Sequence, residues 1–203
     1  MTLLTSRTMF NDASSPIALL ASRRSGKPRD MVAPGPNALQ LRQILEIAIR
    51  TPDHGKLAPW RFVVVGAEQR DAFRNVLRRA YLDGKPEAGR LELEAIDQFA
   101  GQAPTLVIAL AKPAHASHIP LWEQELSVGA ACMNLLTATH ALGFVGGWLT
   151  GWAAYSDAVR DAFGGKDERI AGFIFIGTPS RALDERPRPD YEAVISEWQP
   201  DIA

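Results

Sequence analysis

The sequence predicts an α+β fold of three layers, α/β/α, in which helices flank a mixed central sheet. Residues 61–65 and 105–111 are runs of apolar, often β-branched side chains, which are typical of strands buried on both faces. Helical periodicity fills the segments between such runs, so helices are available to cover both sides of the sheet. The chain of 203 residues, 46% of them hydrophobic and 22% charged, is large enough for one folded domain.

The elements follow from local patterns in chain order. Asn37 and Gln40 form a candidate capping box, Gly143 is a candidate left-handed helix stop and Ser156 a candidate N-cap. The patterns predict helices at 16–22, 37–50, 68–82, 87–100, 121–142 and 156–163, and strands at 61–65, 105–111, 144–150 and 170–176.

The two ends of the chain differ from the middle. Residues 1–15 are expected to be a flexible N-terminal arm, and residues 16–203 a single domain. Residues 181–203 contain three prolines, mixed charges and one strand-like stretch at 191–195. These residues have too few apolar positions to fold on themselves, so we expect a C-terminal arm that lies over a partner subunit.

Composition excludes several classes of function. The net charge of −1 and the scattered arginines argue against nucleic-acid binding. No apolar run reaches the length of a membrane span and the first residues lack a signal-peptide pattern, so we expect a cytoplasmic protein without membrane contact. Cys132, the only cysteine, lies in a helical pattern and is expected in the core. His115 and His118 lack the spacing and acidic neighbours of a metal site, and we expect no metal.

A basic turn at residues 23–27 is the first candidate site. Arg23, Arg24, Ser25 and Lys27 place two guanidinium groups, a hydroxyl and an ammonium within five residues. Guanidinium groups can donate paired hydrogen bonds to a phosphate, and a hydroxyl adds a further donor. A solvated basic turn is the alternative interpretation.

A second turn, at residues 50–56, carries Arg50 and His54 around Pro52 and Asp53. An imidazole can donate or accept a hydrogen bond, so His54 could contact a polar atom of a conjugated ring. In the alternative interpretation Asp53 caps nearby amides and His54 is solvated.

The third motif is the glycine-bounded segment 146–151. Its glycines permit a close approach to the backbone, and Trp148 adds a large aromatic surface. The segment matches neither the dinucleotide fingerprint G-x-G-x-x-G nor a phosphate loop. A strand with Trp148 in the core is the alternative. The chain also lacks a G-x-S-x-G nucleophile motif.

Together these motifs resemble the nitroreductase family, flavoenzymes that pass electrons from NAD(P)H through FMN to a second acceptor. The resemblance covers residues 16–200 and rests on the order of RRS, PDH before PW, WEQELS opening an Ala-rich helix, GGW, and FIGTP before a proline-rich tail. This order is similar to the short bacterial branch of the family. It implies a nitroreductase-like fold and a homodimer with FMN at the subunit interface.

The resemblance also implies residue roles. Arg23, Arg24 and Ser25 would hold the FMN phosphate and ribityl chain, and Lys27 would lie near the flavin ring. The remaining expected contacts to FMN are Arg50 and His54 from the partner subunit, Trp148, Leu149 and Thr150 at the ring, and Arg186 and Arg188 at the phosphate. The segment expected near NADH or NADPH is Ala138, Thr139, His140, Ala141, Leu142 and Gly143.

The implied activity is hydride transfer from NAD(P)H to flavin N5 and then to a small acceptor such as a nitroaromatic or a quinone, in ping-pong order and without a catalytic side chain. The sequence departs from the family pattern in two places. His54 and Lys56 stand where the common family turn has Ser and Asn, and Leu149 stands where a polar or basic residue is expected. An FMN-binding module with little turnover and a specialised reductase of another metabolite are the alternatives.

Overall fold

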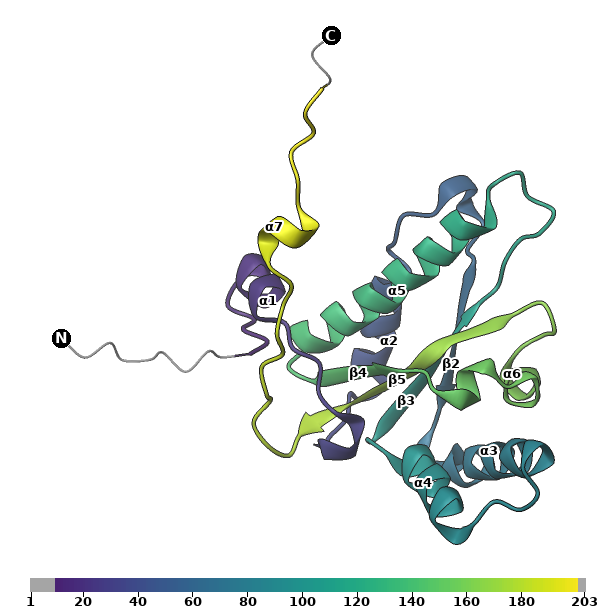
Figure 1. Cartoon of the computed structure of the whole chain (residues 1–203). Helices are drawn as coiled ribbons and strands as arrows, with labels where there is room; N and C mark the ends of the chain where they lie inside the picture. The colour runs from purple at the N-terminus through teal and green to yellow at the C-terminus, as the bar shows by residue number, and fades with distance from the viewer. Residues whose placement is uncertain (1–9, 201–203) are drawn as a thin grey trace.

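The computed structural model describes residues 10–200 of the chain. Five strands form one sheet in the order β1-β5-β3-β2, and β4 also pairs with β5 (Figure 1). The strands are β1 (Met31–Val32), β2 (Trp60–Val65), β3 (Thr105–Ala111), β4 (Val145–Leu149) and β5 (Arg169–Pro179). Strand β3 pairs with one edge of β5, so β4 pairs with the other edge. Among the described residues, strand β2 pairs with β3 alone, and β2 and β4 are therefore outer strands.

Helices cover both faces of this sheet (Figure 1). On one face α2 (Ala38–Ala48) and α5 (Leu121–Ala141) pack on a core that includes Leu135 and Ile174. On the other face lie α3 (Arg70–Gly84), α4 (Arg90–Gly101), the 3-10 turn η4 (Trp152–Tyr155) and α6 (Asp157–Phe163). Phe73, Phe99 and Phe173 form an aromatic cluster in that second core. The three-layer fold is therefore confirmed.

The sheet differs in one respect from the mixed sheet that was predicted. Each strand pairing among residues 10–200 is antiparallel, so the parallel pair of a mixed sheet is missing from this part of the chain. A run of apolar residues indicates that both faces of a strand are buried, but it does not indicate whether the strand is parallel or antiparallel to its neighbours. In β3, residues 106–110 are all buried as predicted, whereas Val64 of the outer strand β2 is 39% exposed.

The predicted helix ends are confirmed at several positions. Asn37 and Gln40 form a reciprocal capping box at the start of α2. Ser156 accepts a hydrogen bond from the backbone N–H of Val159 and caps α6. Gly143, with φ of +83°, follows the end of α5. Cys132 is fully buried, as predicted.

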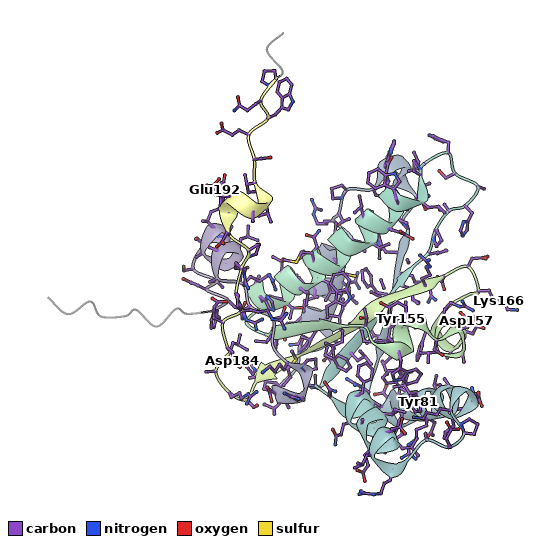
Figure 2. All side chains as sticks on the ribbon, viewed as in Figure 1. Tyr81, Tyr155, Asp157, Lys166, Asp184 and Glu192 are labelled. Carbon is purple, nitrogen blue, oxygen red and sulfur yellow. The ribbon has the colours of Figure 1, made fainter. Side chains whose placement is uncertain are left out.

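The C-terminal segment is helical where a strand was predicted. Residues Tyr191–Val194 form the single turn α7, in which the N–H of Ile195 donates to the carbonyl of Tyr191. A strand needs a neighbouring strand, whereas a helical turn makes its hydrogen bonds internally. The tail contacts the basic turn after α1 (Pro16–Ser22), where Arg24 donates to the Asp184 carbonyl, and then extends away from the body, with Glu192 on α7 (Figures 1 and 2).

Part of the expected N-terminal arm is held in place. The side chain of Asn11 donates to the carbonyl of Arg24 at 3.1 Å and accepts from the Arg24 N–H at 2.8 Å. Residues 10–15 are thus anchored next to the basic turn, and the remaining part of the expected arm, 1–9, lies outside the described residues. No helix within residues 10–200 is long and apolar enough to cross a lipid bilayer.

Candidate functional site

The basic turn and the glycine-bounded segment lie side by side at the outer edge of β4. The N–H of Gly26 donates to the carbonyl of Gly146 at 3.2 Å. A Cβ at Gly147 would come within 2.8 Å of the Gly26 carbonyl oxygen, and one at Gly26 within 2.5 Å of Val145. Glycines at these positions let two backbones approach closely, so the fold joins two motifs that are 120 residues apart.

The same edge is fastened to the end of α5 by His140. The N–H of Gly146 donates to Nε2 of His140 at 3.1 Å, so the neutral ring carries its proton on Nδ1. Burial and the charge of Arg23 lower the pKa of His140 to about 4, and the ring is therefore neutral at pH 7. Nδ1 is buried without a hydrogen-bond partner among the described residues.

Four arginines gather beside this edge from the two ends of the domain. Burial, followed by the charges of Arg188 and Arg24, lowers the pKa of Arg23. The pKa of Arg24 is lowered by burial and then by Arg186 and Arg188. An anion bound among these guanidinium groups would relieve their mutual repulsion.

The cluster is only partly neutralised by its own chain. Arg23 donates to the Ser25 hydroxyl at 3.1 Å, and Arg24 donates to the Asp184 carbonyl oxygen. The Asp184 carboxylate lies 3.4 Å from the ammonium of Lys27. Within residues 10–200, Arg23, Arg24 and Arg186 have no carboxylate partner. These groups offer charged donors to an outside anion.

After Gly147, the three residues that were expected to contact the flavin ring have different surroundings. The Trp148 indole N–H donates to the Ala171 carbonyl at 3.0 Å, and the residue is 38% exposed rather than in the core. Leu149 packs partly against the core on the α3 and α4 side. Thr150 is exposed and lines part of a cavity of about 320 Å³.

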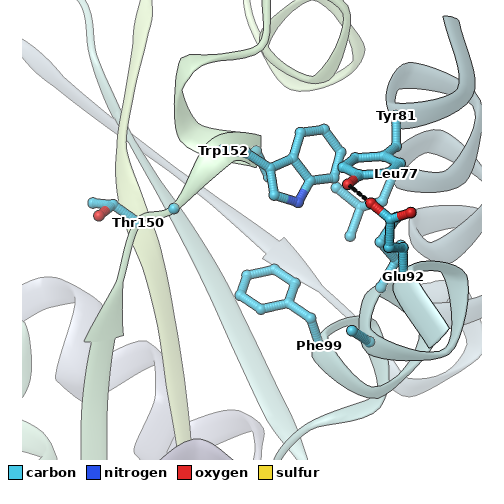
Figure 3. Close-up of a pocket in the computed structure, with 10 residues that line it drawn as sticks. Leu77, Tyr81, Glu92, Phe99, Thr150 and Trp152 are labelled. Atoms are coloured by element: carbon cyan, nitrogen blue, oxygen red, sulfur yellow. Dashed lines mark hydrogen bonds between the residues drawn. The ribbon is translucent and has the colours of Figure 1, made fainter. Parts of the chain in front are cut away.

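Apolar side chains line most of this cavity (Figure 3). The Trp152 indole meets the Tyr81 ring edge-on, with 5.0 Å between ring centroids. Lys85 and Tyr81 each donate to Glu92 at 2.7 Å, and together with the Gly89 N–H they lower the pKa of Glu92 to about 2. The lining consists of Leu77, Tyr81, Glu92, Ala95, Ile96, Phe99, Thr150, Gly151, Trp152 and Ala153. The cavity therefore suits a small uncharged molecule.

Tyr81 and Trp152 had not been identified from the sequence. They lie about 70 residues apart in α3 and η4, and no local spacing connects them. Their aromatic character alone was consistent with ordinary core packing.

A single copy of the chain does not bring His54 to this site. Nδ1 of His54 lies 2.8 Å from the Glu123 carboxylate, in the first turn of α5, whereas His140 lies in the last turn. Seventeen residues separate these two positions, which is about 25 Å along a helix axis. Arg50 is exposed, and its carbonyl accepts a hydrogen bond from Asn134, which lies between Glu123 and His140 on α5.

Half of the segment expected near NAD(P)H is internal. Ala138, Thr139 and His140 are buried. Only Ala141, Leu142 and Gly143 reach the surface, just where α5 ends. Contact with a nucleotide at this segment remains a prediction that involves its last three residues.

Comparison with known proteins identifies the family. The model for the nitroreductase family matches residues 20–178. The chain belongs to the nitroreductase family. It is 36% identical over 167 residues to "Putative NAD(P)H nitroreductase YdjA" of Escherichia coli K12, covering 80% of this chain and 87% of that protein. The Haemophilus influenzae protein "Putative NAD(P)H nitroreductase" is 37% identical over 165 residues, with the same coverage.

Solved structures support the same fold. A nitroreductase-like family protein of Bacillus cereus has a TM-score of 0.77 at 16% identity, and the match covers 92% of this chain and 97% of the other. Iodotyrosine deiodinase bound to FMN and 3-iodo-L-tyrosine has a TM-score of 0.64 at 23% identity, covering 89% and 97%. At these identities the likeness concerns the fold alone.

Proposed function

We propose that this nitroreductase-family protein is an FMN-dependent oxidoreductase that uses NADH or NADPH to reduce a small acceptor. The observation that carries the proposal is the group of four arginines beside the glycine-lined edge of β4. A phosphate monoester would supply the negative charge that Arg23, Arg24 and Arg186 lack within the described residues. The relatives named as NAD(P)H nitroreductases support the choice of electron donor.

The residues around this edge fit FMN in distinct roles. Arg23, Arg24 and Ser25, with Arg186 and Arg188, would hold the phosphate and the adjoining ribityl chain. Lys27, Trp148, Leu149 and Thr150 would border the ring. When bound, FMN supplies the redox chemistry by accepting a hydride from NAD(P)H at N5 and passing electrons to the second substrate. The protein binds FMN, orients it and shields it from solvent, and no side chain is required as a general base.

The cavity beside Thr150 is the proposed acceptor site. Its walls are apolar and aromatic, and the Glu92 carboxylate is already occupied by three donors. A flat, uncharged nitroaromatic or quinone suits these walls, whereas a volume of about 320 Å³ is small for a whole nucleotide. We propose a ping-pong order, in which the oxidised nicotinamide leaves before the acceptor enters.

We further propose a homodimer with FMN at its interface. The 25 Å between the two ends of α5 separates His54 from the arginine cluster, so a second copy would have to bring His54 to the flavin. The tail carries exposed Tyr191, Val194, Ile195 and Trp198. An apolar groove between α2 and the outer strand β2, lined by Leu41, Leu45, Ile49, Trp60 and Phe62, offers a surface on the partner for such side chains.

An anaerobic titration of the FMN-loaded protein tests this function. We expect NADH or NADPH to bleach the flavin absorbance, and a quinone or nitroaromatic to restore it. Initial rates at several acceptor concentrations should give parallel double-reciprocal lines. Flavin that binds but is not bleached by either nucleotide would instead identify a flavin-holding module.

A further inference from the structure

Three polar residues on α5 lie along one line of the helix. Glu123, Ser127 and Asn134 are spaced by four and seven residues, so at 100° per residue they fall within about 40° of one another around the axis. Ser127 is buried, and Glu123 is two-thirds buried. Polar side chains buried on such a helix need partners close by.

All three contact the turn that carries Arg50 and His54. The Ser127 hydroxyl donates to the carbonyl of Pro52 at 2.6 Å. The amide of Asn134 donates to the Arg50 carbonyl at 2.9 Å and to the Thr51 hydroxyl at 2.8 Å. These contacts fix the backbone of the turn against α5.

Glu123 differs from the other two because it contacts a side chain. Its carboxylate lies 2.8 Å from Nδ1 of His54, and a carboxylate can only accept, so Nδ1 carries the proton of this hydrogen bond. Nε2 lies on the far side of the imidazole ring, and the His54 side chain is 65% exposed. One ring nitrogen is thus held by α5 while the other faces outward.

We propose that Glu123 is a positioning residue that orients His54 and fixes its tautomer, so that Nε2 is the atom offered to the flavin of the neighbouring copy. This inference rests on the proposed FMN function, because it assigns the role of His54 at that site. Ser127 and Asn134 hold the turn against α5, and Glu123 holds the imidazole ring of His54 in one orientation. Neighbouring Glu125 lies on another face of the helix and pairs with Arg169 at 2.8 Å, which makes it a matched control.

A double-mutant cycle on FMN affinity tests the proposal. We expect Glu123→Ala to raise the FMN dissociation constant about three- to tenfold, the effect of one lost orienting hydrogen bond. The same substitution in a His54→Ala background should have no further effect, because the ring it orients is gone. Glu123→Gln keeps an acceptor oxygen and should restore most of the affinity. Glu125→Ala should leave it unchanged.

An equal loss from Glu123→Ala in both backgrounds would show a structural effect on the turn and would overturn the proposal. So would an unchanged FMN affinity in His54→Ala.

Nitrogen NMR of the His54 ring gives a readout that needs no flavin. At a pH where the ring is neutral we expect the proton on Nδ1, and its shift toward Nε2 in Glu123→Ala. A proton on Nε2 in the unsubstituted protein would contradict the inference even if FMN binds, whereas failure to bind FMN with Nδ1 protonated would count against the proposed function.

Discussion

The His140 side chain connects the end of α5 to the glycine edge and lies near the charge of Arg23. Its ring is fully buried and accepts the Gly146 N–H. Burial disfavours the charged form of the ring, and protonation would also place a second positive charge beside Arg23. The folded state therefore holds the pKa of His140 at about 4, compared with 6.5 for an unperturbed histidine.

This difference predicts a pH dependence of stability. Between pH 4 and 6.5 the unfolded chain binds more protons than the folded one, so the free energy of unfolding rises with pH in this window. As the pH falls from 6.5 to 4, up to about 3 kcal/mol should be lost from this residue. Urea unfolding at a series of pH values measures it. His140→Gln, whose side-chain oxygen can accept the Gly146 N–H, should show a weaker pH dependence, and an identical slope in both proteins would rule this origin out.

At the residue scale, the hydrogen-bond donors of the candidate site could be predicted from the sequence, whereas the residues that they contact could not. Arg23, Arg24 and Ser25 stand in a short basic turn, which a local pattern can find. The neutral state of His140 and the contact of Lys27 with Asp184 depend on packing between residues far apart in the chain. Nothing near His140 in the sequence indicates that Arg23 lies close to it.

At the element scale, β4 carries the site because its glycines admit the basic turn. Gly147→Ala would bring a methyl group against the Gly26 carbonyl, a backbone atom that cannot move aside alone. We expect a loss of stability of about 1–3 kcal/mol and weaker FMN binding. Thermal unfolding and FMN titration measure the two effects. Gly101→Ala in α4, where a Cβ has open space, is the control. If both substitutions behave alike, close packing of the turn on β4 is not required.

The α4 wall of the cavity gives a second prediction. Ala95 is exposed and lines the cavity, so a larger side chain can fill the space without disturbing the core. Ala95→Trp should raise the KM for a quinone or nitroaromatic acceptor by about tenfold, which corresponds to about 1.4 kcal/mol of lost contact. The KM for NAD(P)H and the affinity for FMN should stay the same. An unchanged acceptor KM would place the acceptor elsewhere.

Elements with a repeated pattern were predictable and those fixed by distant contacts were not. The apolar run of β3 and the capping box of α2 each contain their own signal. Strand β1 has only two residues and exists because Met31 and Val32 pair with the end of β5. The stretch 191–195 has strand-like composition but no strand to pair with among the described residues, and it forms a helical turn.

For the whole molecule, the exposed tail predicts a stable dimer. Trp198 is 83% exposed, and a partner subunit would bury it. The interface is expected to exceed about 2,000 Å² and to persist on dilution. Sedimentation at sub-micromolar concentration should give twice the mass of the chain. Trp198→Ala should increase the monomer fraction, whereas Leu91→Ala, an exposed apolar residue on α4, should not. A monomer that still oxidises NAD(P)H would refute the shared site.

The central claim is that the arginine cluster binds the phosphate of FMN, and the comparison of FMN with riboflavin tests it most directly. The two ligands differ only in the phosphate, and charge-assisted hydrogen bonds contribute about 1.5–3 kcal/mol each. The protein should therefore bind FMN at least about a hundredfold more tightly than riboflavin. The double substitution Arg23→Ala and Arg24→Ala should remove most of this preference and weaken FMN binding far more than riboflavin binding. Equal affinity for the two flavins, or a preference for FMN that survives both substitutions, would contradict the account.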